Sequence, residues 1–305
     1  MLQFLIKRLL TIVSTLVVLA TLTFFLMRIV PGGPFDSDKA LPPEIKANVE
    51  AKFKLNLPLW QQYTEYMFGL AQLDFGPSYK YVGRNVNEII AESLPTSIEL
   101  GIYSLILALL LGLPLGIMSA YKQNTWVDFS SMFFAVAGVS APSYFVGAIL
   151  IYVFCLQFNW FPPALWEDWR SAVLPTITLG VRPAALIARL TRASLLESLR
   201  SDYVRTARAK GVSEFFVIMK HALRNSLIPV VTLLGPLTAY IVTGTFVIEY
   251  IFAIPGMGKH FINAVTNRDY PLIMGVTMVF GFMLVLSNLI VDITYAIIDP
   301  RIRIS

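Results

Sequence analysis

Several long stretches of this chain carry no charged side chain, and they constrain its fold more than any other feature. A helix rises about 1.5 Å per residue, so about 20 apolar residues cross the hydrocarbon core of a bilayer. Each stretch of that length predicts a membrane-spanning helix. Five stretches approach or exceed it: Leu9 to Met27, Leu100 to Ala120, Phe129 to Phe158, Ser226 to Ile248 and Tyr270 to Val291.

The composition agrees with a membrane protein. Hydrophobic residues make up 56% of the chain and charged residues 14%, whereas soluble domains carry charge on about a quarter of their residues. A sixth stretch, Ser171 to Ala188, is apolar except for Arg182 and contains Pro175 and Pro183. We count it as a span because the topology requires it. The sequence therefore predicts an all-α membrane protein with six transmembrane helices.

Basic residues indicate the orientation. With six spans, both termini and the loops 121–128 and 189–225 lie on one side. That side is rich in Lys and Arg, as cytoplasmic loops are, so the N and C termini are predicted to be cytoplasmic. The net charge of +5 thus reports topology and not nucleic-acid binding. The basic residues on this side are Lys7, Arg8, Lys122, Arg189, Arg192, Arg200, Arg205, Arg208, Lys210, Lys220, Arg224, Arg301 and Arg303.

The order of these features suggests four parts. An N-terminal transmembrane helix (1–30) precedes an extracytoplasmic segment (31–95), a transmembrane core (96–298) that contains a cytoplasmic loop (192–226), and a cytoplasmic tail (299–305). The first span is expected to be a retained anchor. Its apolar run is longer than the roughly 7 to 15 residues of a signal-peptide core, and no A-x-A cleavage site follows it.

Two amphipathic helices are predicted in the extracytoplasmic segment. The Pro-Gly-Gly-Pro run at 31–34 must end the first helix. Pro43 to Phe53 and Leu59 to Leu70 then carry apolar residues at helical spacing, and the aromatic rings of the second favour the membrane surface. Two roles stay open for these helices, a structural cap over the bundle and contact with a substrate.

Glycine and proline interrupt two of the spans. In membranes, glycine lets two helices approach closely and proline bends a helix. We expect close contacts or kinks at these positions, as a solute pathway needs. The residues are Gly112, Pro114 and Gly116 in the second span and Gly138, Pro142 and Gly147 in the third.

The most informative segment is residues 192–229, which is too polar to cross a membrane and yet is periodic. Apolar residues every four positions predict an amphipathic helix. Gly211 then supplies the left-handed conformation that commonly ends a helix. The residues of the apolar stripe are Leu195, Leu199, Tyr203 and Ala207.

A second helix is predicted after this glycine. Ser213 can cap the free N–H groups of its first turn, and Glu214 is favourable at the positive end of the helix dipole. The apolar side of this helix would consist of Phe215, Ile218, Met219, Ala222 and Leu223.

Two roles stay open for such a helix, glycine, helix element. Its basic residues would hold it on anionic lipid at the membrane surface. Alternatively, it would project as a rigid body into a groove on a soluble partner and transmit the movement of that partner. The periodicity alone is equally compatible with both.

At these residues the chain resembles a known family. Arg205-Thr206-Ala207, followed after three residues by Gly211, resembles the EAA-x-x-x-G loop of ABC importer permeases, and the RTARAKG form is typical of the oligopeptide and dipeptide branch. Arg205 stands where the general motif has Glu, and Arg224 stands where its tail has Pro. The resemblance implies that the loop docks into ATPase subunits, while the polar contacts of Arg205 stay open.

Further motifs extend the resemblance along nearly the whole chain, in the order that the family has them. The chain is identified as a member of the oligopeptide and dipeptide permease B-type family, whose relatives also handle glutathione, nickel complexes and other small solutes. The matching segments are Pro31 to Pro34, Asp74 to Gly76, Leu115 to Ile117 with Lys122 and Asp128, Val247 to Gly258, and Asn267 to Pro271 with Asp292 and Asp299-Pro300.

The resemblance implies a fold, a location and partners. The fold is that of a type I ABC importer permease in the bacterial inner membrane. The partners are a second, homologous permease, two ABC ATPase subunits, an extracytoplasmic solute-binding protein, membrane lipid and a peptide substrate, and no nucleic acid. ATP and Mg would be bound by the ATPase subunits, so no cofactor is expected in this chain.

The resemblance also implies candidate site residues. The segment Ile254 to Tyr270 is either the contact with the binding protein or a structural re-entrant turn, and its candidates for the contact are Pro255, Gly256, Gly258 and Asp269. The candidates for coupling to the ATPase are Tyr203, Arg205, Thr206, Ala207, Lys210, Gly211 and Phe215.

Arg182 is a candidate residue of the translocation path, because a charge inside a membrane is costly and often functional. It would line the cavity and meet the carboxylate of a peptide. Alternatively, it is structural, either snorkelling to the membrane surface or paired with Glu249 or Asp292.

Enzymatic functions find little support. Gly256-Met257-Gly258-Lys259 lacks the first glycine of a phosphate loop, since Ala253 stands there. His221 and His260, the two histidines, are predicted on opposite faces of the membrane, which excludes a shared catalytic pair or a histidine-based metal site. Ser140 lacks the second glycine of a GxSxG elbow. An intramembrane protease and a passive channel stay as alternatives, to be tested by cleavage and by ATP-independent flux.

Overall fold

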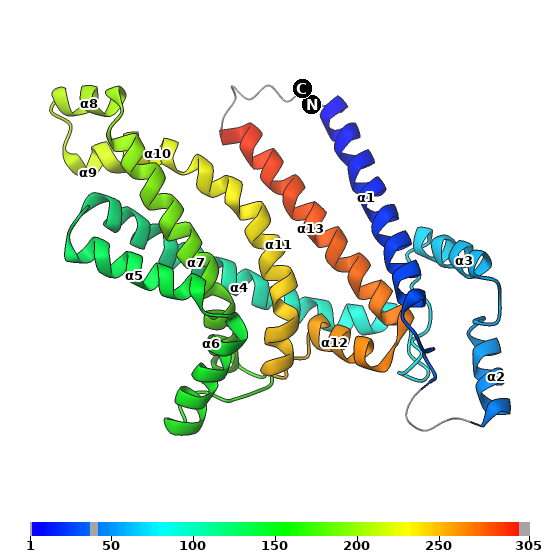
Figure 1. Ribbon diagram of the computed structural model, residues 1–305. Helices are drawn as coiled ribbons and strands as arrows, with labels where there is room; N and C mark the ends of the chain where they lie inside the picture. Colours follow the sequence, from blue (N-terminus) through cyan, green and yellow to red (C-terminus); the bar gives the residue numbers. More distant parts are fainter. Residues whose placement is uncertain (1, 37–41, 299–305) are drawn as a thin grey trace. The chain divides into compact units, whose positions relative to one another are not determined.

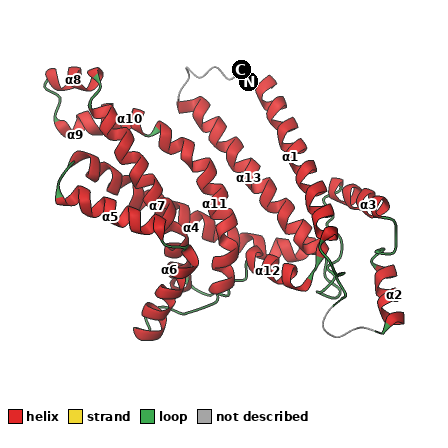
Figure 2. Ribbon diagram, in the orientation of Figure 1, coloured by secondary structure: helices red, strands yellow, loops and turns green. Residues whose placement is uncertain are grey.

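The computed structural model describes residues 2–36 and 42–298. Within these ranges the chain is helical and contains no strand, only an isolated bridge between Pro77 and Asn85, as Figure 2 shows. The predicted all-α class is confirmed. The α-helices are α1 (Leu2–Ile29), α2 (Pro43–Lys52), α3 (Leu59–Ala71), α4 (Val86–Tyr121), α5 (Trp126–Ser140), α6 (Ser143–Leu150), α7 (Trp169–Leu199), α8 (Asp202–Ala209), α9 (Glu214–Phe216), α10 (Leu223–Ser226), α11 (Ile228–Ile251), α12 (Met257–Asn267) and α13 (Tyr270–Ile298), with π-helical turns at Ile151–Gln157 and Val217–Ala222 (Figure 1).

Five of the described helices, α1, α4, α7, α11 and α13, are long and apolar enough to cross a membrane. A sixth span requires counting α5 together with the helix Ser143–Gln157, and these two are bent by 104° at a short break. The stretch from Phe129 to Phe158 is therefore not one continuous helix, and the bend falls at one of the positions where a kink was expected. The break falls at Ala141-Pro142, since a proline disfavours helical conformation in the residue before it.

The weakest predicted span is a full helix. α7 continues through Pro175 and Pro183, and 67% of its most apolar stretch is buried, the largest share among the five helices. It packs against α5, α6, α10 and α11. Because its neighbours are protein, it needs less hydrophobic surface than a helix that faces lipid.

The chain forms two compact units. The first unit comprises Met1–Ser97 and Ile254–Val285, and the second comprises Ile98–Ala253 and Leu286–Ser305. In the first unit, α3 packs on α1. Phe24 of α1 is fully buried, and its ring lies 5.3 Å from that of Tyr63 and 5.7 Å from that of Tyr66. The predicted amphipathic helix thus packs Tyr63 and Tyr66, both partly buried, against the first span, while Trp60 and Phe68 stay exposed.

In the second unit, glycines let α4 and α7 approach closely, as predicted. A Cβ atom at Gly112 would lie 2.6 Å from the carbonyl oxygen of Ala184, and one at Gly116 would lie 2.6 Å from that of Ala188. These distances are shorter than any van der Waals contact. Side chains are therefore excluded at both positions of α4.

Candidate functional site

The predicted coupling loop is a chain of short helices between α7 and α11, here named the α8–α10 element (residues 200–227), which Figure 1 shows at the end of α7. A single helix through Leu195 and Ala207 was expected, and that prediction is wrong. α7 ends at Leu199, and α8 begins after Ser201, whose extended backbone takes the N-cap position. The signal for this break was Ser201-Asp202, a capping residue followed by an acid in the first turn.

The break also changes which residues are buried. Val204 and Ala207 pack in a core cluster with Leu195, Val217, Ile218 and Ala222. Tyr203, which was expected on the buried stripe, is 42% exposed. α8 starts anew, so its inner face begins at Val204 and not at the next position of the α7 stripe.

Gly211 has the predicted left-handed conformation, with a φ of 76°. Its N–H donates to the carbonyl oxygen of Arg208 at 2.9 Å, and the N–H of Val212 donates to that of Ala207 at 3.3 Å. These bonds close the end of α8. No atom lies within 4 Å of a Cβ built on Gly211, so glycine is required by the backbone conformation and not by lack of space.

An ion pair spans this turn. Arg208 donates from Nη2 to Oε1 of Glu214 at 2.6 Å and from Nε to Oε2 at 3.1 Å. These hydrogen bonds lower the pKa of Glu214 and raise the pKa of Arg208. Glu214 lies in the first turn of α9, as predicted, while Ser213 occupies the N-cap position without a side-chain capping bond. The arrangement fixes α8 relative to α9.

The second half of the element exposes several large apolar side chains. Phe215 is 67% exposed, Phe216 57% and Met219 44%. Phe215 and Met219 were expected on the same side as Ile218 and are not. The π-helical turn Val217–Ala222 changes the spacing, so that Val217 and Ile218 face the core. The element therefore presents aromatic side chains outward, as a surface that binds a partner does.

Among the other predicted coupling residues, Thr206 and Lys210 are exposed. Arg205 is also exposed, and it forms a long contact of 3.4 Å with Asp202 in the preceding turn. Its guanidinium therefore has donors available for a partner.

A buried ion pair that was not among the predicted site residues joins α5 to α7, eight residues before the element begins. Arg192 of α7 donates to both carboxylate oxygens of Asp128 in α5, at 2.7 and 2.8 Å. Asp128 also accepts from Ser119 Oγ at 2.5 Å and from the N–H of Asn124 at 3.0 Å, and is 2% exposed. The signal was a carboxylate at the end of an apolar span, which requires a partner.

Arg182 lies in α7, with its guanidinium carbon 5.3 Å from the centre of the Tyr240 ring. The Tyr240 hydroxyl lies 2.9 Å from that of Ser143. In the described ranges Arg182 forms no ion pair, so one structural alternative, the pairing with Glu249 or Asp292, is not observed there. Its role in the translocation path stays a prediction.

The candidate contact with a binding protein falls on α12 and its flanks in the first unit. Pro255 is exposed, whereas Gly256 and Gly258 are buried. Asp269 is fully buried. Its carboxylate accepts hydrogen bonds from Ser78 Oγ and from the N–H of Tyr79, the latter at 3.1 Å. The contact stays a prediction, with Pro255 as its most accessible residue.

No cluster of potential metal ligands occurs in the part of the chain that the structure describes. His221 lies in the α8–α10 element and His260 in α12, and these belong to different units. The His260 Nδ1 atom lies 3.4 Å from the hydroxyl of Tyr81. Each histidine therefore has its own local environment.

Family comparisons decide the class of protein. Residues 112–304 match the family described as the binding-protein-dependent transport system inner membrane component, and residues 1–101 match the N-terminal region of such membrane components. The chain belongs to this family. It is thus a multi-pass inner-membrane protein of a binding-protein-dependent transport system, a class that works with ATPase and solute-binding partners.

Individual members of the family are similar to this chain over its full length. The chain is 44% identical to the dipeptide transport system permease protein DppB of Bacillus subtilis, over 100% of this chain and 99% of that protein. It is 46% identical to the oligopeptide transport system permease protein OppB of Haemophilus influenzae, over 99% of this chain and 100% of that protein.

The fold resembles that of solved importers. The inward-facing MetNI methionine ABC transporter matches with a TM-score of 0.56 at 16% identity, over 69% of this chain and 96% of that chain. An amino acid ABC transporter matches with a TM-score of 0.56 at 13% identity, over 68% and 94%. The predicted importer permease fold is confirmed.

Proposed function

We propose that this chain is a permease subunit of an ATP-driven importer of short peptides. It pairs with a homologous permease, two ATPase subunits and an extracytoplasmic solute-binding protein. The full-length similarity to dipeptide and oligopeptide permeases supports the choice of peptides. ATP and Mg are bound by the ATPase subunits, and this chain supplies half of the translocation path.

The α8–α10 element carries the proposal. It projects from the end of α7, exposes aromatic side chains, and contains an ion pair that joins α8 to α9. A second ion pair fixes the preceding part of α7 to α5. A helix that lies on lipid gains little from such rigidity. A helix that must transmit force from one subunit to another requires it, because a flexible element would absorb the movement.

The proposed mechanism follows from these contacts. The element docks in a groove of an ATPase subunit, on the cytoplasmic side that also holds both termini. When the ATPases close on ATP, the docked element moves. The Asp128–Arg192 pair passes this movement to α5 and α7, and the path changes from inward to outward facing. The binding protein then releases its peptide into the path.

The test of coupling is Gly211→Val, with Gly83→Val as the matched control. Both glycines have a positive φ, 76° and 79°, and open space around a Cβ, so the two substitutions impose similar backbone strain. We expect Gly211→Val to abolish peptide-stimulated ATP hydrolysis in proteoliposomes while membrane insertion persists. Gly83→Val should keep the stimulation. Equal stimulation in both variants would contradict the docking role.

The test of substrate is uptake by cells that lack this subunit. Loss of uptake of labelled di-, tri- and pentapeptides, restored by the gene, is the expected result. Intact peptide uptake with lost uptake of nickel complexes or glutathione would replace peptides by those solutes. Flux that persists without ATP would indicate a channel.

A further inference from the structure

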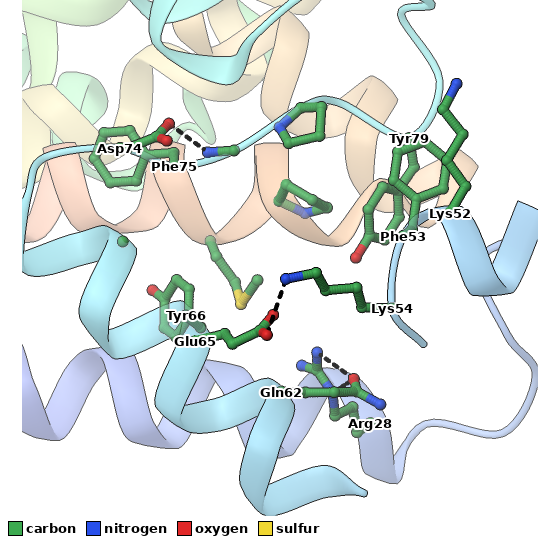
Figure 3. Close-up of a pocket in the computed structure, with 15 residues that line it drawn as sticks. Arg28, Lys52, Phe53, Lys54, Gln62, Glu65, Tyr66, Asp74, Phe75 and Tyr79 are labelled. Carbon is green, nitrogen blue, oxygen red and sulfur yellow. Dashed lines mark hydrogen bonds and ion pairs between the residues drawn. The ribbon is translucent and has the colours of Figure 1, made fainter. Parts of the chain in front are cut away.

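The first unit contains a pocket of about 380 Å³ that the coupling mechanism does not use. Its walls come from the end of α1, from α3, from the chain after α2, from the loop 74–79 and from the start of α13 (Figure 3). Pockets that bind small ligands measure roughly 300 to 1,000 Å³. The volume is therefore that of a site for a small molecule.

Arg28 supplies a positive charge to this pocket. Its guanidinium donates to Gln62 Oε1 from two nitrogens, at 3.1 and 3.3 Å, and to the carbonyl oxygen of Phe24 at 3.1 Å. It also lies 3.4 Å from the centre of the Phe24 ring. All of these partners are neutral, and within residues 2–36 and 42–298 no carboxylate pairs with Arg28.

This arrangement leaves donors unused. A guanidinium has five N–H groups, and three hydrogen bonds occupy part of them. Guanidinium groups bind carboxylates through two parallel hydrogen bonds, which are stronger than bonds between neutral groups. A half-buried Arg28 fixed by neutral partners is thus prepared for an anion from outside the chain.

Tyrosine hydroxyls add to the same site. The hydroxyl of Tyr66 is buried and has no hydrogen-bond partner in the described structure. Burial raises the pKa of Tyr66 and of Tyr79 to about 12, and the nearby charge of Arg28 lowers both in part. At neutral pH each phenol therefore keeps its proton, and its O–H group can donate a hydrogen bond to an anion. An unsatisfied buried hydroxyl is costly, so a ligand that accepts from it gains affinity.

The pocket also contains negative charge. Figure 3 shows Lys54 reaching Glu65 within the pocket, at 2.9 Å, while Arg28 and Gln62 lie together nearby. Glu65 offers an acceptor for an ammonium group. Phe53 and Met274 supply apolar walls. A pocket that combines opposite charges with apolar walls suits a molecule that has an ammonium group, a carboxylate and side chains.

We propose that this pocket binds a short peptide in its free, zwitterionic form, with the C-terminal carboxylate on Arg28 and the ammonium group towards Glu65. The inference rests on the proposed function for the class of ligand. A small molecule is favoured over an acidic side chain of the binding protein because the charges line a cavity and not a flat surface. Arg28 and Glu65 then discriminate peptides with free ends from peptides with blocked ends.

The experiment measures binding of tritiated dialanine to the complete importer in nanodiscs, without binding protein and without ATP. Dialanine amide, which lacks the terminal charge, is the matched ligand. We expect the wild-type complex to prefer the free acid about ten- to hundredfold, as the loss of one charged hydrogen-bonded contact predicts. Arg28→Gln should abolish the preference, and Arg28→Lys should keep part of it.

Two further variants control the result. Arg84→Gln removes an arginine of the same unit that already pairs with Glu92, and it should keep the preference. Gln62→Glu places a carboxylate where Gln62 Oε1 accepts from Arg28. It should also abolish the preference, without removing the cation, and it replaces Arg28→Gln as the decisive variant if that protein fails to assemble.

Equal binding of acid and amide by the wild-type complex overturns the inference. So does a preference that Arg28→Gln and Gln62→Glu both retain. Crosslinking of this pocket to an acidic residue of the binding protein, without peptide binding, would assign it to the partner. The proposed function fails separately, when the wild-type complex with its binding protein and ATP transports no peptide.

Discussion

Arg208 and Glu214 lie on either side of the left-handed Gly211 and join α8 to α9 by two hydrogen bonds. The pair is half exposed, with side-chain exposures of 41% and 42%. Exposed ion pairs contribute little to global stability, typically between 0 and about 1 kcal/mol. The contribution of this pair is therefore local, to the relative orientation of two short helices.

Glu214→Gln should separate orientation from stability. We expect the melting temperature of the purified complex to stay within about 2 °C of wild type, since the pair is exposed. Peptide-stimulated ATP hydrolysis should fall severalfold, because α8 and α9 no longer move as one body. Arg208→Gln should produce the same loss, and the double variant should add little. Additive losses would indicate that each residue contacts the ATPase independently.

The same pair predicts a dependence on acid. The pKa of Glu214 is lowered in the folded chain. The ion pair therefore stabilises the turn fully at any pH above the pKa of a glutamate in the unfolded chain, about 4.3. It is lost as the pH falls through the lowered pKa of the folded state. The protection factors of the amides of residues 208–214 should thus stay constant from neutral pH down to about pH 4 and decrease only below it. A loss of protection between pH 6 and pH 5 would contradict a lowered pKa of Glu214.

Asp128→Asn should destabilise the fold strongly. The carboxylate is buried and accepts from Arg192, Ser119 and the backbone of Asn124. Removal of one partner from a buried ion pair costs about 3 to 5 kcal/mol, because the other charge is left unpaired. The measurement is thermal unfolding in detergent. The control is Asp202→Asn, whose side chain is 97% exposed and which should melt as wild type does.

Two glycines of α4 offer a matched pair of substitutions. Gly112→Ala places a Cβ 2.6 Å from the Ala184 carbonyl oxygen, whereas Gly101→Ala places one 3.6 Å from Ile241, an ordinary contact. Overpacking costs about 1 to 3 kcal/mol, while alanine gains up to about 1 kcal/mol over glycine in a helix. We expect Gly112→Ala to lower the yield of assembled complex and Gly101→Ala to preserve or raise it. The reverse order would show that α4 and α7 do not pack this closely.

Asp269→Asn tests whether this residue acts inside the chain. The carboxylate accepts hydrogen bonds from Ser78 Oγ and from the N–H of Tyr79. Loss of these bonds leaves buried donors without an acceptor, which costs about 1 to 3 kcal/mol. Amide exchange at Tyr79 should become faster even without binding protein. Unchanged exchange together with weaker binding-protein affinity would instead assign Asp269 to the interface.

Apolar length predicted most of the membrane-spanning helices, because the requirement to cross a membrane is strict. Apolar length does not give the direction of a helix, however. A kink or close contact was expected at Pro142, but the angle of 104° between the two halves of that stretch could not be predicted from the sequence. The identity of the buried residues in α8 was also missed. A four-residue stripe assumes one continuous helix, and the Ser201-Asp202 cap ends that continuity one residue before Tyr203.

Contacts between distant residues were the least predictable. The pair of Asp128 with Arg192 joins residues 64 positions apart, and the pocket around Arg28 gathers residues from five segments. No local sequence pattern predicts contacts between residues so far apart in the chain. The neighbour of Arg182 was not predicted either. It is the ring of Tyr240 and not one of the acidic residues that its charge suggested.

The burial of α7 has a consequence for biogenesis. A helix with Arg182 and two prolines in its apolar part has weak affinity for lipid, because a central arginine costs at least about 2.5 kcal/mol on insertion. Its contacts with α5, α6 and α11 replace contacts with lipid. We therefore expect stable insertion of α7 to depend on its neighbouring helices. In a nascent chain that ends before α11, α7 should not be fully inserted in the membrane.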